Sequence, residues 1–582
     1  MYKIQAVTIY AQLFFASMCL RHLRAGMLEE IKNINAGRTG DIQGLQTAVE
    51  LLINVVEELS AEKDSLKKEV QRLRDENSRL KGGNARPVIK GNKKISGDIS
   101  SHGREKGKAG KKHPGDNNAE PAKPQSAIET DEDIKIEIAA ADLPADAVFK
   151  GYTPYIRQDL VIKRYNKRFL LATYYSASEG RSIRAALPPG ETEGHYGCGI
   201  RSLINILHHY GNVTHSSLEG LMKGFGIKIS AGSICNLLKG ELEWAVAEQS
   251  SILQAGLRHT APGQMDSTGN RQRGVNKVTH IITSPLFSVF YTLPTKSRMD
   301  CLRALQGNPA GGVQLAWHEG METVFRAAGV SMQDCSQVLA ALKSHGAFHL
   351  GIDEFAALLA SQAPGVFAKQ RIVGIVTEAM AFYYYTQQTA FPRPQVLMSD
   401  DAPEYKKIAP FHALCWVHDA RYYNKLAPQI TISIERLEAF KAQYWEFYQT
   451  LLDYKTLLPA AQNAQKTSIS QAFDRLFGQT TRYGALDLCI QRTRENKSQL
   501  LQVLDFPSLP LHNNAAELAA RRVVRKRDIS LHTWTDWGTQ LRDAFLSIIE
   551  TAGKLGVSAY QYINDRITAQ RIMPSLAQLI SP

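Results

Sequence analysis

A heptad pattern is the clearest regularity among the hydrophobic and polar positions of the chain. Between residues 41 and 81, leucine recurs at every d position and mostly β-branched residues occupy the a positions. The d residues are Leu45, Leu52, Leu59, Leu66, Leu73 and Leu80, and the a residues are Ile42, Val49, Val56, Lys63, Val70 and Asn77. This pattern is typical of a parallel two-stranded coiled coil. We therefore predict a leucine zipper that joins chains into a homodimer or a higher oligomer.

The charges beside this apolar seam agree with pairing between two helices. Glu62 and Glu69 stand at g positions, and Lys67 and Arg74 stand at the following e positions, so opposite charges face each other across a parallel pair. A buried Asn77 would fix the register at some cost in stability. An intrachain helical hairpin is the alternative, and the unbroken run of heptads favours the intermolecular coil.

The segments on either side of the zipper lack a globular pattern. Residues 1–40 form an N-terminal extension whose apolar run is short for a membrane span and is interrupted by polar residues. A targeting segment is the alternative, and no membrane partner is expected. Residues 82–145 are predicted to be a disordered basic linker, because their composition offers too little apolar surface to offset ordering. The basic half either follows a phosphate backbone or serves only as a soluble connection.

The next two segments differ in the period at which their hydrophobic residues recur. Residues 146–190 are predicted to form a small β module, because β-branched and aromatic residues lie on both sides of a turn-like Asn166-Lys167. Residues 191–258 return to helical periodicity, with two short helices around a glycine turn and Ser230 as an N-cap candidate. This helix-turn-helix pattern either enters a DNA groove or is an ordinary packing unit.

Two aspartates lie in or directly after predicted strands. Asp266 precedes two strand-like runs, residues 277–283 and 286–293, whose short connection predicts an antiparallel meander. Residues 395–399 form a short apolar strand that ends on Asp400. Because adjacent strands lie about 5 Å apart, the two carboxylates are expected to meet on one sheet.

A glutamate on a predicted helix completes a set of three acids. Asn513 and Asn514 are good N-cap residues for the helix formers that follow, and Glu517 lies one turn into that helix with Arg521 on the same face. Hard oxygen ligands of this kind suit magnesium. Two aspartates and a glutamate can hold two Mg²⁺ ions, or Mn²⁺ in their place, for phosphoryl transfer. Each acid alone has a simpler explanation as a surface or capping residue.

Composition narrows the choice of partner and compartment. A chain of 582 residues divides into several domains. A formal net charge of +13 suits a polyanionic partner such as nucleic acid. The seven cysteines are scattered and never form a C-x-x-C pair, which excludes a disulfide framework and a zinc finger and fits a reducing cytoplasm.

The residues around the three acids resemble the insertion sequence 66 family of bacterial DDE transposases. The likeness covers most of the chain beyond residue 41, including the zipper, residues 149–238 and residues 542–567. It is carried chiefly by DSTG at 266–269, SDDAPEY at 399–405, HALCWVHDAR at 412–421 and LPLHNNAAE at 509–517.

The resemblance implies roles for particular residues. Asp266, Asp400 and Glu517 would be the catalytic, metal-binding triad. Asp401 competes with Asp400, which is preferred because Tyr405 stands five residues later, where the family has an aromatic residue. Supporting residues around the metals would be Asp401, Trp416, His418, Asn513 and Asn514. For Trp416 and His418 the alternative is a core aromatic and its hydrogen-bonded neighbour.

The chain also departs from the family pattern. Leu518 stands where the family usually has arginine, His512 stands where many members have aspartate, and the cysteine zinc module of many members is missing. A basic cluster follows on the same predicted helix: Arg521, Arg522, Arg525, Lys526 and Arg527. It either grips a DNA backbone or forms a solvated face.

These observations together predict an α/β protein with a ribonuclease-H-like catalytic core at residues 259–570, helical insertions that include residues 306–394, and the zipper, β module and helix-turn-helix-like domain before it. The function that the resemblance implies is a dimeric DNA transposase in the bacterial cytoplasm, associated with the nucleoid, which cleaves and transfers the strands of an insertion sequence. One alternative is a catalytically weakened DNA-binding relative, which Leu518 favours. Another is a coiled-coil interaction protein without DNA chemistry.

Overall fold

The computed structural model describes residues 42–80 and 130–581, except for 140–141, 145–146, 161, 189–193, 261–262 and 308–311. The predicted N-terminal extension and most of the predicted basic linker lie outside these residues. Within the described ranges, no helix combines the length and apolarity that a bilayer crossing requires.

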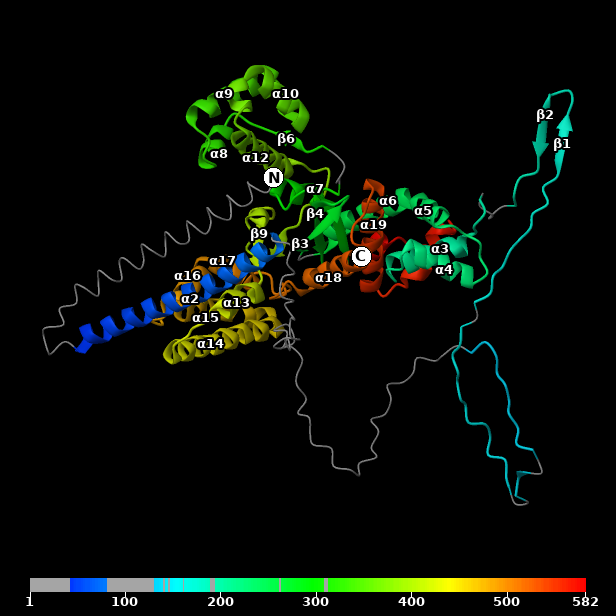
Figure 1. The fold of residues 1–582 in the computed structure, drawn as a ribbon, viewed down its shortest axis with the longest axis horizontal. Helices are drawn as coiled ribbons and strands as arrows, with labels where there is room; N and C mark the ends of the chain where they lie inside the picture. Colours follow the sequence, from blue (N-terminus) through cyan, green and yellow to red (C-terminus); the bar gives the residue numbers. More distant parts are fainter. Residues whose placement is uncertain are drawn as a thin grey trace.

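A mixed five-stranded sheet lies at the centre of the molecule (Figure 1). Its strands are β3 (Gly263–Gln272), β4 (Val275–Thr283), β5 (Ser288–Leu293), β8 (Val396–Ser399) and β9 (Phe411–Leu414). The spatial order is β5-β4-β3-β8-β9. The first three strands form the predicted antiparallel meander, whereas β8 pairs with β3 and β9 in parallel. The protein is therefore a mixed α/β fold.

Helices from the C-terminal part of the chain cover this sheet. α18 (Asn514–Ser530) packs on β3 and β4, and α19 (Asp536–Lys554) packs on β5 and on α6 (Leu242–His259). The apolar face of α19 is buried, and Gly556 follows the end of the helix with φ +70°. The last helices are α20 (Ala559–Ile567), which packs on α3 (Cys198–His209), and α21 (Leu576–Ile580), which packs on α6.

The predicted helix-turn-helix pair is present in the structure. Its helices are α4 (His215–Gly224) and α5 (Ala231–Gly240), which pack on each other. Gly226 supplies a positive φ of +76° in the turn between them. Ser230 caps α5, since its hydroxyl accepts a hydrogen bond of 3.1 Å from the Ser233 N–H. The predicted N-cap is thus confirmed.

The hairpin in the predicted β module lies further along the chain than expected. Its strands are β1 (Thr173–Ser176) and β2 (Arg181–Arg184), which extend away from the sheet (Figure 1). The turn uses Gly180 at φ +61°, and the Ser176 hydroxyl accepts from the Glu179 N–H at 3.2 Å. The predicted turn at Asn166-Lys167 is wrong, because a serine-glycine turn with local side-chain support lies ten residues later.

The segment between the two aspartates is mostly helical, as predicted. It contains α7 (Arg298–Leu305), β6 (Gln314–Ala316), α8 (Met321–Ala327), α9 (Met332–His345), β7 (His349–Gly351), α10 (Ile352–Gln362), α11 (Pro364–Phe367) and α12 (Gln370–Gln387). Strands β6 and β7 pair with each other in a separate two-stranded sheet. Buried side chains such as Phe325, Phe355 and Met380 join this segment to the core beneath the main sheet.

A second helical block, called the helical region below, was not predicted. It comprises α13 (Trp416–Lys425), α14 (Thr431–Thr456), α15 (Pro459–Phe477), α16 (Gly484–Glu495) and α17 (Lys497–Leu500). Its core is separate from that of the sheet and is built largely of aromatic rings: Trp416, Phe440, Tyr444, Phe447, Phe473 and Phe477. The region connects β9 to the segment before α18, so it links two of the three acids along the chain.

The predicted zipper is a single long helix, α2 (Ile42–Leu80), of 39 residues. Figure 1 shows it in blue beside the helical region, and side-chain hydrogen bonds join the two.

Candidate active site

Strand register brings the two predicted aspartates together. Gly263 of β3 pairs with Leu397 of β8, and Gln264 pairs with Met398. The same register, continued by two residues, sets Asp266 opposite Asp400 just beyond the end of β8. Neighbouring strands lie about 4.8 Å apart. The two carboxylates therefore belong to one edge of the sheet, as predicted.

The third acid is carried to this edge by α18. The Asn513 side-chain amide donates a hydrogen bond of 3.1 Å to the Met265 carbonyl, one residue before Asp266. Asn513 occupies the N-cap position but its side chain makes no cap hydrogen bond. The predicted capping role is therefore wrong for this residue, because its amide attaches the helix to β3 instead. This attachment sets Glu517, one turn further on, beside the strand that carries Asp266.

The pKa of Asp266 responds to its burial and to the other two acids. Burial, and to a smaller extent the nearby charges of Asp400 and Glu517, raise the pKa of Asp266 to about 6. The Ser267 N–H, which donates to the Asp266 carboxylate at 2.7 Å, and the Lys296 ammonium act in the opposite direction. A partly buried carboxylate with two acidic neighbours is a site where a cation would relieve repulsion.

Two residues of α13 hold Glu517 in its present place. Arg421 donates from Nη2 to Glu517 Oε1 at 2.8 Å, and His418 Nε2 lies 3.3 Å from the same oxygen. Burial and the Arg421 charge lower the pKa of His418. The structure thus places His418 beside the acids, as the sequence suggested. Arg421 was not singled out, although its i, i+3 spacing from His418 puts both on one helical face.

Asp401 is engaged with a different set of partners. Its carboxylate accepts from Arg492 Nη2 at 2.7 Å and lies 3.3 Å from Lys406 Nζ. Asp400 instead accepts the Ala402 N–H at 3.2 Å. Because the Asp401 carboxylate already contacts two cationic side chains, Asp400 is the better candidate of the pair for a metal ligand.

Trp416 lies in a core rather than at the acids. Its ring is fully buried among the aromatic rings of the helical region, and its indole N–H donates to the Leu500 carbonyl at 2.9 Å. Its backbone N–H donates to the Leu511 carbonyl at 3.0 Å, which joins α13 to the segment before α18. Trp416 therefore fits the alternative interpretation as a core aromatic. Asn514 is the first residue of α18 and is half-buried.

The side chains of the basic cluster on α18 differ in exposure and in partners. Arg521 and Arg525 are exposed, and Arg522 pairs with Glu550 at 2.9 Å. Arg527 donates to the Gly269 carbonyl at 2.5 Å, which adds a second link between α18 and β3.

Lys526 does not fit the predicted contact with DNA. It is buried, donates to the His208 carbonyl at 2.6 Å, and has a pKa lowered to about 8 by that burial. The sequence did not distinguish Lys526 from the other basic residues, because neighbours in sequence face different directions on a helix.

The two departures from the family pattern lie at distinct kinds of position. Leu518 is 57% exposed, so the missing arginine leaves an open surface position beside Glu517. His512 is half-buried in the segment before α18, and burial lowers its pKa.

The donor set fits magnesium, although the described side chains are not arranged as a finished metal site. Among the residues that the structure describes, no three His, Cys, Asp or Glu side chains are close enough to bind one ion. Asp266 nevertheless senses the charges of Asp400 and Glu517, and the three carboxylates provide the hard oxygen donors that Mg²⁺ prefers.

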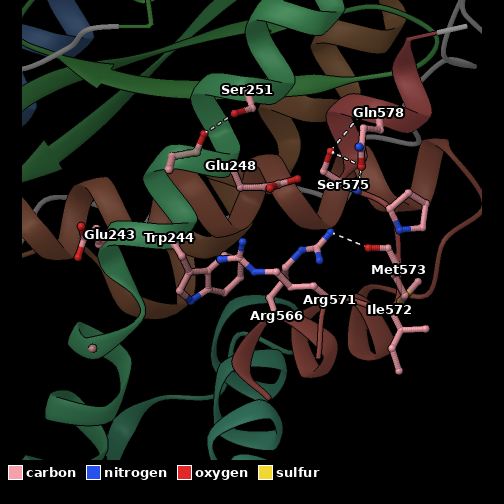
Figure 2. A pocket seen from close by; sticks show the side chains of 13 residues that line it. Glu243, Trp244, Glu248, Ser251, Arg566, Arg571, Ile572, Met573, Ser575 and Gln578 are labelled. Atoms are coloured by element: carbon pink, nitrogen blue, oxygen red, sulfur yellow. Dashed lines mark hydrogen bonds between the residues drawn. The ribbon is translucent and has the colours of Figure 1, made fainter. Parts of the chain in front are cut away.

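A large hollow elsewhere in the chain has a structural explanation. It has a volume of about 930 Å³ and lies between α6 and the last two helices, lined by residues that include Trp244, Glu248 and Arg566 (Figure 2). Glu248 accepts from the Leu576 N–H at 3.1 Å, and Arg566 donates to the Met573 carbonyl at 3.1 Å. These polar groups fasten the C-terminal helices, and the hollow lies away from the three acids.

Comparison with known proteins identifies the family of the chain. The Transposase IS66 family profile matches residues 383–541, a range that contains Asp400 and Glu517. A protein of Sinorhizobium fredii (strain NBRC 101917 / NGR234), "Uncharacterized protein y4jO", is 30% identical over 338 residues, which are 57% of this chain and 99% of that relative. The chain belongs to the insertion sequence 66 family of transposases. Membership of this family supports a transposase function and connects the chain with insertion sequences and DNA transposition.

Proposed function

We propose that the chain is a DNA transposase that cleaves the ends of an insertion sequence and transfers the freed strands to target DNA. The observation that carries this proposal is that the β3–β8 register sets Asp266 opposite Asp400, while Asn513 attaches the start of α18, which carries Glu517, to β3. Transposase family membership supports the same conclusion independently.

The sheet supports a ribonuclease-H-like core. Three antiparallel strands followed by two parallel strands, with the first strand central, give the order β5-β4-β3-β8-β9. One acid in the first strand, one after the fourth and one on a covering helix match the arrangement that the resemblance implied.

The three acids would hold two Mg²⁺ ions, with Mn²⁺ as a substitute. When bound, the ions supply activation of the attacking water or 3′ hydroxyl and stabilisation of the leaving oxygen. The chain contributes the position and protonation of the donors. Burial favours the protonated form of Asp266 below a pH of about 6, so a cation would have to displace this proton at lower pH.

Arg421 and His418 orient Glu517 from the helical region. The Arg421 guanidinium neutralises Glu517 in the present arrangement, and a divalent cation would compete with it for the same oxygen. An arginine released beside the site is well suited to a DNA phosphate, because guanidinium and phosphate match in shape and charge.

DNA is the proposed partner along a wider surface. The exposed Arg521 and Arg525 follow Glu517 on α18 and would contact the backbone on either side of the reacting phosphate. The α4–α5 pair has the geometry of a helix-turn-helix, and we assign it a role in DNA binding. Work on chromosomal DNA would place the protein in the bacterial cytoplasm at the nucleoid.

A weakened relative that binds DNA without efficient cleavage is the second candidate. Exposed Leu518 replaces an arginine next to Glu517, which removes one cation from the surface where DNA would lie.

A strand-cleavage assay separates these functions. The substrate is duplex DNA carrying the inverted repeats that flank the coding region, and the parent chain is compared with Asp266→Ala in Mg²⁺. The proposal predicts nicked product from the parent and none from the variant, with equal binding of the substrate by both. Binding without cleavage by the parent would favour the weakened relative. Equal product from parent and variant would rule out the triad.

A further inference from the structure

The apolar seam of α2 is left uncovered by the other residues that the structure describes. All a and d positions whose side chains are described are exposed: Val49, Leu52, Val56, Leu59, Lys63, Leu66, Val70 and Leu73. From the first to the last of these residues the stripe extends roughly 36 Å along the helix. An apolar stripe of this length on a described helix calls for a partner.

The opposite face of α2 is already engaged, and Glu57 forms its centre. This carboxylate is 6% exposed and accepts hydrogen bonds from the backbone N–H groups of Gln429, at 2.8 Å, and Ile430, at 2.7 Å. α14 begins at the next residue, Thr431. Glu57 therefore caps α14 from a distant part of the sequence, where a negative charge also suits the helix dipole.

Asn54 and Glu50 extend the same contact. The Asn54 amide accepts from the Gly484 N–H at 3.0 Å and donates to the Arg482 carbonyl at 3.3 Å, at the start of α16. Glu50 pairs with Arg482 at 2.7 Å and lies 3.6 Å from Arg436. The contacts of α2 with α14 and α16 thus lie at the N-terminal ends of these helices and in the loops before them, where backbone groups need hydrogen-bond partners.

Helical spacing separates these two faces. Glu50, Asn54 and Glu57 are four and three residues apart, so they share one face. In the heptad they occupy b and f positions, which lie on the outside of a coiled coil, away from a and d. Docking to the helical region therefore leaves the seam open.

We propose that α2 is a two-faced helix. Its outer face, Glu50, Asn54 and Glu57, latches onto the helical region of the same chain, and its seam receives α2 of a second copy. Charge pattern supports a second copy as the occupant, because Glu62 faces Lys67 and Glu69 faces Arg74 in a parallel pair. In the single chain Glu69 pairs with Arg72 on its own helix, an exposed pair that gives way at little cost.

The latch connects the dimer to the acids. α16, held by Asn54 at its first residue, carries Arg492, which binds Asp401 beside Asp400. α13, which shares a core with α14 and α16, carries Arg421 and its contact with Glu517. Two copies joined at the seam would thus hold their helical regions on the outside of one coil. This inference concerns assembly and stands whether or not cleavage is observed.

The full-length chain allows each face to be broken separately. Leu59→Asp in the seam should convert a dimer into a monomer, measured by light scattering during size-exclusion chromatography. Glu57→Ala and Asn54→Ala, singly, should leave the dimer intact, because neither residue lies in the seam.

Hydrogen exchange reports on the latch directly, because the amides of Gln429, Ile430 and Gly484 donate to α2 side chains. Glu57→Ala should raise the exchange rates of the Gln429 and Ile430 amides at least tenfold. Asn54→Ala should raise the exchange rate of the Gly484 amide. Leu59→Asp should leave all three amides protected. Asp64→Asn, at the same heptad position one heptad later, is the matched control and should change none of them.

Three results would overturn the proposal. The parent chain could be monomeric at micromolar concentration, the seam variant could remain dimeric, or the latch variants could keep full protection of the three amides. The milder Glu57→Gln variant retains side-chain size and checks that loss of protection is not general unfolding.

Discussion

The sheet and the helical region contribute side chains of opposite charge to the candidate active site. The sheet supplies Asp266 and Asp400, and α18 adds Glu517 on the same edge. The helical region has its own core and supplies cationic partners, Arg421 for Glu517 and Arg492 for Asp401. This difference in charged neighbours distinguishes an acid that serves a structural contact from an acid that is a candidate metal ligand. Asp401 is held by two cations, whereas Asp266 sits beside two other carboxylates and has a raised pKa.

The largest expected effect tests this division between neighbouring acids. Asp400→Asn should lower strand cleavage by at least about a thousandfold, equivalent to roughly 4 kcal/mol of transition-state stabilisation. Asp401→Asn should lower it less than about tenfold, because that residue serves the contact with Arg492. Single-turnover cleavage with saturating DNA measures both. A reversed order would show that Asp401 is the ligand.

The helical region should depend on its aromatic core. Trp416→Ala removes a fully buried ring and an indole hydrogen bond, and should cost about 3–5 kcal/mol of unfolding free energy. Urea unfolding measures the loss, with Trp534→Ala, whose ring is 69% exposed, as the control at within about 0.5 kcal/mol. Equal losses from the two variants would contradict the assignment of Trp416 to the core.

Asp266 should make the metal-free protein less stable above pH 6. Its pKa rises from 3.8 in the unfolded chain to about 6 in the folded chain, so the folded state binds the proton more tightly and stability falls as the pH rises between these values. At pH 8 in a chelator, Asp266→Asn should be more stable than the parent by roughly 2–3 kcal/mol. At pH 3.5 the two should agree. A variant less stable than the parent at pH 8 would disprove the raised pKa of Asp266.

The smallest expected effect concerns Arg421, the side chain that holds Glu517. Arg421→Gln should lower cleavage about tenfold, near 1.4 kcal/mol, and Arg421→Lys should restore part of it. The dependence of the rate on Mg²⁺ concentration should also move to lower concentrations in Arg421→Gln, because a competitor for Glu517 is lost. An unchanged Mg²⁺ dependence would mean that Arg421 does not compete with the metal.

Strand and motif signals predicted most of the site, whereas contacts between distant segments did not show in the sequence. Asp266 and Asp400 could be assigned because alternation and apolar runs mark strands locally. Glu517 could be placed on a helix, but the use of Asn513 to bind the Met265 carbonyl depends on tertiary packing.

The remaining errors have the same physical origin. The helical region was missed because its aromatic residues pack on one another across three helices, α13, α14 and α15, which no local period reveals. Lys526 belonged to a basic run in sequence, yet its position on α18 points it into the core beside His208. Arg421 received no role because its partner lies 96 residues away.

Direct measurement of divalent-metal binding tests the central claim most sharply. Calorimetric titration of the full-length chain with Mn²⁺ at pH 8 should show binding that Asp266→Asn, Asp400→Asn and Glu517→Gln each weaken at least tenfold, while Asp401→Asn leaves it unchanged. Retention of full affinity in any one of the three variants, or its loss in Asp401→Asn, would contradict a shared site formed by Asp266, Asp400 and Glu517.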